Sequence, residues 1–258
     1  MVSELPLARR DAIAARLAQG QSVVATVLAA EFAISEDAIR RDLRTLAAQG
    51  LCRRVYGGAL PLVPGSTPIG ARIGADRARK LALARAAAAL IRPGELVFLD
   101  SGSTNLALAD LLPEDLDLVV ATNSIPAAAA LLSRQDLRLL LIGGTVDPVV
   151  GGCVDAAAAL GVAALNIDRC FLGACAVEPV AGLGAFEASD ATFKRALLAA
   201  SRHSLVLATS DKLGARAPHR LAPLDRLERL IVEHDADPAM LAALTHAGAR
   251  ILQAASGT

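Results

Sequence analysis

Short apolar segments alternate with helix-forming segments along the chain from Glu95 onward. Continuous apolar strands that alternate with helices are typical of a mainly parallel sheet with helices on both faces. The alternation therefore predicts an α/β fold for most of the chain. The predicted strands span residues 96–99, 118–121, 137–142, 167–172, 205–208 and 230–232. The predicted helices span residues 105–112, 125–132, 156–165, 190–201 and 238–246.

The chain is long enough to hold two domains, each with its own core. Of its 258 residues 54% are hydrophobic but only 2% are aromatic, so we expect cores of closely packed Leu, Val, Ile and Ala. Residues 60–70 contain three prolines and two glycines, a composition typical of a linker. We therefore predict a first domain at 1–60, a linker at 61–71 and a larger domain at 72–258 that opens with a helix.

The first sixty residues contain three helical patterns, with a very short turn between the second and the third. The first pattern runs over about 7–18, and Ser22 is placed to cap the second. Ser35 is a good cap for the third, and this spacing is typical of a helix-turn-helix. The apolar face of the second helix is predicted to contain Val24, Val27 and Leu28.

Apolar residues gather on one side of the third predicted helix and charged residues on the other. A helix with these two sides can pack on a small core while it enters the major groove of DNA. For this helix taken alone, an ordinary solvated surface is the alternative. The apolar side contains Ile39, Leu43, Leu46 and Ala47. The charged side contains Asp37, Arg40, Arg41 and Arg44.

A basic β-strand is predicted directly after this helix. Gly50 stops the helix, residues 51–56 are compatible with a strand, and Gly57-Gly58 is a turn signal. Residues 40–54 carry a local charge of +4 in a chain whose net charge is zero. A strand and turn of this kind beside a DNA-binding helix form a wing, which would let Arg53 or Arg54 reach a DNA phosphate or the minor groove. For Tyr56, the one tyrosine of the chain, contact with the DNA backbone and packing against the helices are both open.

These residues resemble the winged helix-turn-helix of the DeoR family of bacterial regulators. The resemblance rests on Ser35, Ile39-Arg-Arg-Asp-Leu43, Leu46, Gly50 and Gly57-Gly-Ala59, and it departs at Ala38, where the family usually has Thr. It implies that the domain binds operator DNA. The DNA-binding residues that we predict are Ser35, Asp37, Arg40, Arg41, Arg44, Arg53 and Arg54.

Small, hydroxyl or basic residues follow the predicted strands of the larger domain. In parallel sheets, ligands bind outside the carboxyl ends of the strands. The residues at these ends suit a phosphate, because Gly permits a tight loop and the Ser and Thr hydroxyls can bond an anion. Ordinary helix caps and a solvated lysine are the alternatives. The segments concerned are Asp100–Thr104, Thr122–Ser124, Gly143-Gly144, Gly173 and Thr209–Lys212.

This half resembles the sensor domain of the same family, which has a ribose-5-phosphate isomerase-like fold and responds to phosphorylated sugars. The matching text comprises Lys80, Asp100-x-Gly-Ser-Thr104, Thr122–Ser124, Gly143-Gly144, Gly151, the 168–173 segment, Lys194 and Lys212. The family commonly has Asp where this chain has Thr209. The effector-binding residues that we predict are Asp100, Ser101, Gly102, Ser103, Thr104, Thr122, Asn123, Gly143, Gly144 and Lys212.

Together the two halves predict a DNA-binding transcription regulator, in most such cases a repressor, that is controlled by a phosphorylated sugar. By the resemblance its genes serve carbohydrate metabolism, and two-fold operators imply a homo-oligomer. A sugar-phosphate isomerase is the competing class, with Asp168 or Glu187 as a possible base. That class leaves the arginine helix and the wing unexplained, so we expect no enzyme.

The cysteines give little support to a metal or redox sensor. Cys52, Cys153, Cys170 and Cys175 are scattered and lack zinc-ligand spacing, so we expect buried apolar cysteines, no metal and no cofactor. No apolar stretch suits a membrane span and no secretory signal is found, so we expect a cytoplasmic protein.

Overall fold

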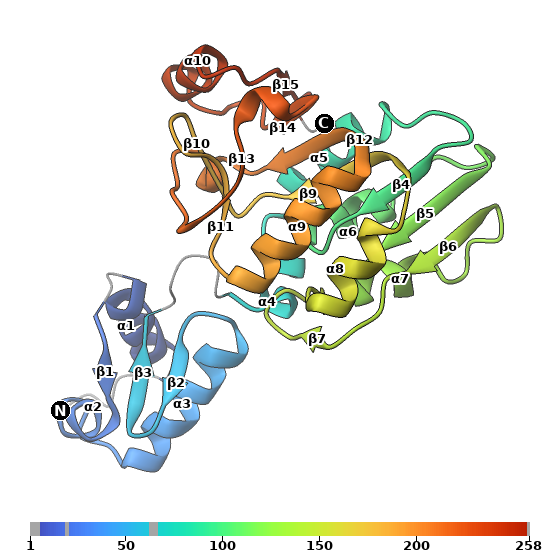
Figure 1. Cartoon of the computed structure of the whole chain (residues 1–258). Coiled ribbons are helices and arrows are strands. Elements are labelled where there is room, and N and C mark those ends of the chain that lie inside the picture. Colours follow the sequence, from blue (N-terminus) through green and yellow to red (C-terminus); the bar gives the residue numbers. More distant parts are fainter. Residues whose placement is uncertain (1–5, 19–20, 62–66, 257–258) are drawn as a thin grey trace. The chain divides into compact units, whose positions relative to one another are not determined.

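The computed structural model describes residues 6–18, 21–61 and 67–256 (Figure 1). The described chain forms two compact units that divide after Arg72. Part of the proline- and glycine-rich stretch predicted as the linker, residues 62–66, lies outside the described residues. The short helix α4 (Ile69–Gly74) follows that stretch and spans the boundary between the units.

The first unit is a winged helix-turn-helix. Three helices, α1 (Pro6–Ala18), α2 (Ala25–Glu31) and α3 (Glu36–Ala48), pack with a small antiparallel sheet of order β1-β3-β2. The strands are β1 (Val23–Val24), β2 (Arg53–Val55) and β3 (Gly58–Leu60). Aliphatic side chains from all three helices close the core, as the low aromatic content predicts. The largest of them are Ile13, Leu17, Leu28, Ile39, Leu43 and Leu46.

Helix α3 forms where the sequence predicts it, for local reasons. The Ser35 hydroxyl accepts the backbone N–H of Ala38 at 3.3 Å, and Glu36 and Asp37 lie in the positive first turn. Gly50 follows the helix with a φ of +69°, a conformation that glycine adopts without strain.

The predicted apolar face of the second helix is wrong in part. Leu28 is buried, but Val24 and Val27 are exposed. Ser22 does not cap the helix, because Val23 and Val24 pair with β3 as strand β1 and delay the helix to Ala25. A pattern of apolar spacing could not reveal this pairing, because it depends on a strand that lies more than thirty positions further along the chain.

The second unit contains a seven-stranded parallel sheet of order β15-β14-β12-β9-β4-β5-β6. All six predicted strands are present and a seventh, β15, was not predicted. The strands are β4 (Leu96–Leu99), β5 (Leu118–Thr122), β6 (Leu137–Leu141), β9 (Ile167–Gly173), β12 (Ser201–Ala208), β14 (Arg229–Val232) and β15 (Ile251–Gln253).

Helices cover both faces of this sheet, which confirms the predicted layers (Figure 1). One core cluster joins the sheet to α8 (Ala156–Ala163), α9 (Ala188–Ala200) and α10 (Pro238–His246). The other joins it to α5 (Arg77–Ala88), α6 (Ser103–Ala109) and α7 (Ile125–Leu131). No helix among the described residues is long and apolar enough to cross a membrane.

Short elements outside the main sheet were not predicted from the sequence. Strands β10 (Ala176–Glu178), β11 (Gly182–Ala185) and β13 (His219–Ala222) form a second sheet, and β7 (Val146–Asp147) pairs with β8 (Gly152–Cys153). The 3₁₀ turns η1 (Ser210–Lys212) and η2 (Leu224–Arg226) follow β12 and β13. Strand β11, with the sequence Gly-Leu-Gly-Ala, is buried at every position, so it lacks the alternation that identifies a half-exposed strand.

Candidate functional site

The exposed face of α3 carries the predicted DNA-binding arginines, but they are not equally available. Arg40 is held by Glu36 at 2.7 Å and lies 3.8 Å from Asp37. Arg41 donates weakly to the backbone oxygen of Asp37 at 3.4 Å. Arg44 is exposed and makes no ion pair within the described residues. Of the three helix arginines, only Arg40 must leave a carboxylate before it can reach a phosphate or a base, and among the described residues Arg44 is held by neither a carboxylate nor a backbone oxygen.

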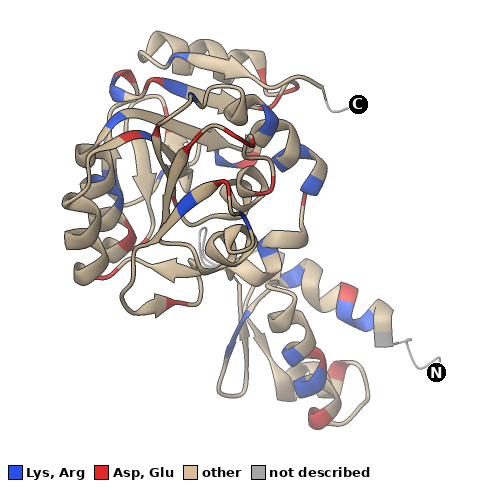
Figure 2. Cartoon of the chain, turned by 90° about the vertical axis from the view of Figure 1, so that its right-hand side faces the viewer, with Lys and Arg blue, Asp and Glu red and all other residues tan. Residues whose placement is uncertain are grey.

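The wing presents Arg53 and Arg54 on the edge strand β2, where every residue is exposed. Neither arginine side chain has a hydrogen-bonding or ion-pairing partner in the described part of the chain. Figure 2 shows basic segments on α3 and on this hairpin. Predicted residues Ser35 and Asp37 lie in the first turn of α3, where the Ser35 hydroxyl also acts as the helix cap.

A buried ion pair holds helix α3 against helix α1. Arg9 of α1 donates from Nε to a carboxylate oxygen of Asp42 at 2.7 Å, and both residues are buried. Asp42 belongs to the Arg-Arg-Asp-Leu text of α3, yet its side chain points into the domain. It therefore fixes the position of α3 rather than contacting a ligand.

In the second unit, the strand order reverses between β4 and β9. From β4 the chain proceeds to β5 and β6 in one direction, and from β9 to β12, β14 and β15 in the other. Such a switch point opens a crevice at the carboxyl ends of the two strands, where α/β sheets bind ligands. Asp100 directly follows β4 here, and its Oδ2 accepts the N–H of Gly173 at the end of β9 at 3.0 Å.

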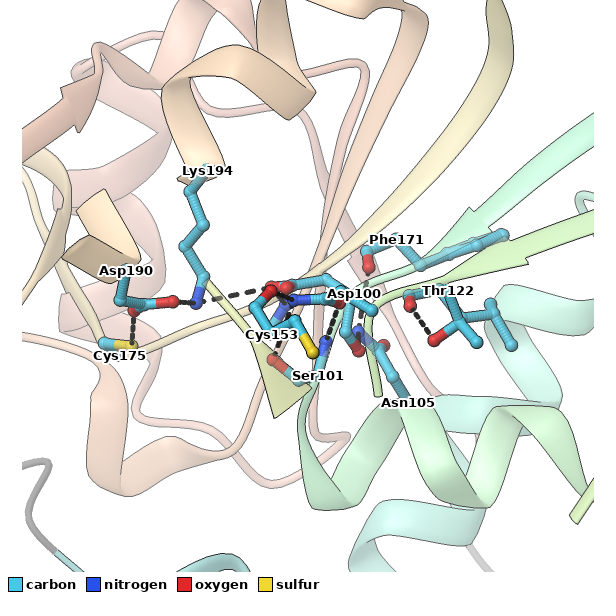
Figure 3. Close-up of polar contacts among 12 residues, drawn as sticks. Asp100, Ser101, Asn105, Thr122, Cys153, Phe171, Cys175, Asp190 and Lys194 are labelled. Carbon is cyan, nitrogen blue, oxygen red and sulfur yellow. Dashed lines mark hydrogen bonds and ion pairs between the residues drawn. The ribbon is translucent and has the colours of Figure 1, made fainter. Parts of the chain in front are cut away.

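A buried lysine from α9 meets Asp100 at this point (Figure 3). Lys194 Nζ lies 3.3 Å from Asp100 Oδ2 and 2.5 Å from Asp190 Oδ1. Burial alone would lower the pKa of Lys194, but the two carboxylates outweigh it and raise that pKa. Burial raises the pKa of Asp100, and Lys194 offsets part of this effect. The thiol of Cys175 lies 3.6 Å from Asp190 Oδ2, and burial raises its pKa.

Two buried oxygens beside this cluster have no hydrogen-bond partner, Oδ1 of Asp100 and Oδ1 of Asn105. The Asn105 amide donates instead to the backbone oxygens of Asp100 and Phe171, which ties the loop to β9. Buried polar atoms in folded proteins nearly always find a partner. The crevice therefore offers unused hydrogen-bond acceptors to a group with donors.

Asn123 connects the predicted phosphate loop to the segment 143–154, which we call the cover segment. Its Oδ1 accepts the N–H of Ser101 at 3.0 Å, and its Nδ2 donates to the oxygen of Cys153 at 3.0 Å. The Cys153 N–H in turn donates to the Asn123 oxygen at 3.0 Å. Gly152 packs so closely that a Cβ there would lie 2.4 Å from the Asn123 oxygen. Asn123 and Gly152 thus hold the cover segment against the loop that follows β4.

The structure brings together most, but not all, of the predicted effector residues. Gly143 and Gly144 begin the cover segment and are exposed. Lys212 pairs with Asp211 at 2.8 Å and shares no hydrogen bond or ion pair with the Asp100 cluster in the described chain. The residues gathered at the switch point are Asp100, Ser101, Gly102, Ser103, Thr104, Thr122 and Asn123.

Neither of the two acids considered as an enzymatic base shares a side-chain hydrogen bond or ion pair with this cluster among the described residues. Asp168 begins β9, at the opposite edge of the sheet from Gly173, and it accepts the backbone N–H of Leu96 at 2.9 Å. Glu187 is exposed at the start of α9. Residue type alone suggested these two acids as bases. Asp168 lies near the start of β9, whereas the Asp100 cluster lies at the carboxyl end of that strand.

Sequence reasoning did not select Lys194, Asp190 or Cys175 as site residues. Lys194 was noted in the family resemblance, but its position inside a helix gave no sign that it would contact Asp100. The Asp190 and Lys194 spacing of four is the one local signal, because it places both side chains on the same helix face. No group of three or more His, Cys, Asp or Glu residues in the described chain is arranged to hold a metal ion.

Comparison with known proteins agrees with both halves of this geometry. A model of the DeoR-like helix-turn-helix domain matches residues 9–62, and a model of the DeoR C terminal sensor domain matches residues 75–234. The chain belongs to the DeoR family. It is a DNA-binding transcription regulator with a winged helix-turn-helix and an α/β sensor domain.

Two relatives of this DeoR-family protein align over nearly its whole length. A transcriptional repressor assigned to the aga operon of Escherichia coli O157:H7 is 30% identical over 95% of this chain and 92% of its own. The glycerol-3-phosphate regulon repressor of Escherichia coli K12 is 29% identical over 89% of this chain and 92% of its own. Among solved structures, ribose 5-phosphate isomerase A of Methanocaldococcus jannaschii is 19% identical and covers 52% of each chain, with a TM-score of 0.37.

Proposed function

We propose that this DeoR-family regulator changes its affinity for operator DNA when a phosphorylated sugar enters the switch-point crevice. The observation that carries this proposal is the buried Asp100 Oδ1, which has no partner although it lies beside Lys194. A sugar hydroxyl is a neutral donor of the right kind for a buried carboxylate oxygen. A second anion, by contrast, would meet an excess of negative charge in a cluster of one lysine and two aspartates.

The phosphate of the effector is assigned to the loop of residues 101–104, which directly follows Asp100. Ser103 and Thr104 supply hydroxyls there, and Gly102 and Gly173 keep the backbone of the loop close to the end of β9. One half of the crevice would thus bind the phosphate and the other half the hydroxyls. This division supports a phosphorylated polyol or sugar over either inorganic phosphate or a plain sugar.

Asn123 is the residue that can transmit the binding of the effector to the cover segment. Its oxygen takes the Ser101 N–H, and its amide nitrogen lies 3.3 Å from the Ser101 hydroxyl. A phosphate on the loop competes with the Asn123 oxygen for the Ser101 N–H and can accept the proton of the Ser101 hydroxyl, and Asn123 also holds the cover segment through Cys153. Differential affinity of the effector for the two arrangements of Asn123 would then bias the protein between two states.

For DNA, we propose that Arg44 of α3 and the wing arginines Arg53 and Arg54 carry the phosphate contacts, with Arg41 and Arg40 beside them. The unpaired state of the first three supports this ranking. A homo-oligomer that reads repeated half-sites fits a helix-turn-helix. By analogy with the two relatives, the regulated genes serve the use of sugars or of a sugar-related phosphate.

We infer that the crevice binds its effector without converting it. Lys194 is held between two carboxylates and is almost fully buried, so it is neither a free base nor a free nucleophile. An assay for isomerisation of pentose and hexose phosphates tests this inference, and turnover would contradict it.

The effector proposal is tested by thermal unfolding of the full chain with ribose 5-phosphate, glucose 6-phosphate and glycerol 3-phosphate. A ligand at 100 times its Kd stabilises by about 2.7 kcal/mol. Inorganic phosphate and the unphosphorylated sugars serve as controls, and we expect them to stabilise much less. Stabilisation by no phosphorylated compound, or equally by a plain sugar, would overturn the assignment.

Residue roles are tested with Thr104→Val, which removes one hydroxyl at nearly constant volume. We expect about tenfold weaker effector binding and unchanged binding of DNA without effector, since one hydrogen bond to a charged group contributes about 1.5 kcal/mol or more. Thr192→Val on the exposed side of α9 is the matched control. Equal effects of the two variants would remove Thr104 from the site.

A further inference from the structure

The aromatic ring of Tyr56 is the most exposed large side chain of the first unit. Its exposed fraction is 107% of the reference value, so no other described residue covers it. Tyr56 and Gly57 form the two-residue turn between β2 and β3, where Val55 pairs with Gly58. An aromatic side chain that contacts nothing contributes little to folding and exposes apolar surface to water.

The turn that carries this ring is firmly anchored. The Gly57 oxygen accepts the backbone N–H of Ala25 at 2.7 Å. Gly58 packs against β1 so closely that a Cβ there would lie 2.1 Å from the Val23 oxygen. Gly57 itself has a φ of +81°, which suits a tight hairpin turn. The backbone that carries the ring is therefore fixed, which lowers the entropy that this turn loses on binding.

The charged residues of the hairpin that carries the ring are both positive. Arg53 and Arg54 precede it on the same edge strand, both exposed and both without an ion-pairing partner in the described chain. The hairpin 51–60 contains no acidic residue. This charge complements the phosphates that line both sides of a DNA groove. The figure of the charged residues shows the same basic strand (Figure 2).

We propose that the Tyr56 ring is a DNA contact that enters the minor groove and packs on the sugar edges there, while Arg53 and Arg54 hold the flanking phosphates. A minor groove is about 6 Å wide, which is too narrow for the two strands of the hairpin but admits a single aromatic ring edge-on. Proteins that bind the minor groove also place aromatic and aliphatic side chains there, in known cases as wedges between base steps. The assignment rests on the DNA-binding function of the first unit.

The chain contains one tyrosine and no tryptophan, so its tyrosine fluorescence reports the wing tip alone. The probe is a duplex that the wild-type protein selects from a randomised DNA pool. When the full-length protein is saturated with this duplex, we expect tyrosine emission to fall and acrylamide to quench it less. Failure to select any duplex would contradict the DNA-binding role itself. Selection followed by unchanged acrylamide access would contradict the Tyr56 contact alone.

Affinity measured over a range of salt concentrations separates the ring from the arginines. Tyr56→Ala should weaken binding to the selected duplex about tenfold and leave the salt dependence unchanged, because the ring neutralises no phosphate. Arg54→Ala should instead reduce the slope of log affinity against log salt by about one. Tyr56→Phe should bind like the wild type, since the ring makes the contact.

Val180→Ala removes another highly exposed apolar side chain, from the second unit, and is the matched control. It should leave both affinity and slope unchanged. Because Tyr56 touches nothing, Tyr56→Ala should also unfold at the wild-type temperature. Wild-type affinity in Tyr56→Ala, or a slope reduced as in Arg54→Ala, would overturn the proposal.

Discussion

Replacement of Lys194 by methionine tests the buried charge cluster at the switch point. The side chains of Lys194, Asp100 and Asp190 are 3%, 0% and 6% exposed, so Lys194→Met leaves two adjacent carboxylates without a cation and almost without water. Removing one partner of a buried pair costs about 3–5 kcal/mol. A carboxyl group can escape this cost only by binding a proton. At pH 7 that step costs about 4 kcal/mol, since the ordinary pKa lies about three units lower.

The loss should therefore depend on pH in a defined direction. A carboxyl group whose pKa is raised by folding binds more protons in the folded state than in the unfolded state. Its destabilising effect is absent below the unfolded pKa and develops as the pH rises toward the folded pKa. Burial already raises the pKa of Asp100, and loss of Lys194 raises it further. The deficit of the variant should be about 4 kcal/mol at pH 7 and about 1.5 kcal/mol at pH 5.

Urea denaturation followed by far-ultraviolet circular dichroism measures this deficit at both pH values. Lys212→Met is the control, because Lys212 forms a partly exposed pair with Asp211 for which we expect a loss below about 1 kcal/mol. A deficit for Lys194→Met below 1 kcal/mol at pH 7, or one that does not shrink toward pH 5, would refute the reasoning.

Three further predictions concern packing and access. Gly58→Ala should destabilise the first unit by about 2 kcal/mol and weaken DNA binding, because its Cβ would meet the Val23 backbone; urea denaturation and a mobility shift check both effects. Arg9→Ala should cost about 3 kcal/mol, since it leaves Asp42 buried without a cation, and a loss under 1 kcal/mol by urea denaturation would contradict this. Burial raises the pKa of Cys175, so its alkylation, followed by mass spectrometry, should speed up as the pH rises past 9.0 and should slow when an effector fills the crevice; an effector without influence would separate Cys175 from the site.

The sequence by itself determined the elements whose signals are local. The Ser35 cap and the spacing of Ile39, Leu43 and Leu46 identified the recognition helix, and the apolar runs identified all six predicted strands of the main sheet. These signals suffice because a cap bonds its own first turn, and because a strand buried on both faces is apolar throughout. The resemblance to the DeoR family rested on short runs of neighbouring residues of the same kind.

Only the tertiary structure decided which distant residues meet. It brought Lys194 to Asp100 and moved Asp168 to the opposite edge of the sheet, because the strand order and the direction of β9 fix both positions. It also exposed Val24, because that residue pairs with β3 as part of β1 and does not lie on the apolar face of α2. Periodicity specifies which face of an element is buried, whereas the partner of that face depends on contacts between segments far apart in the chain.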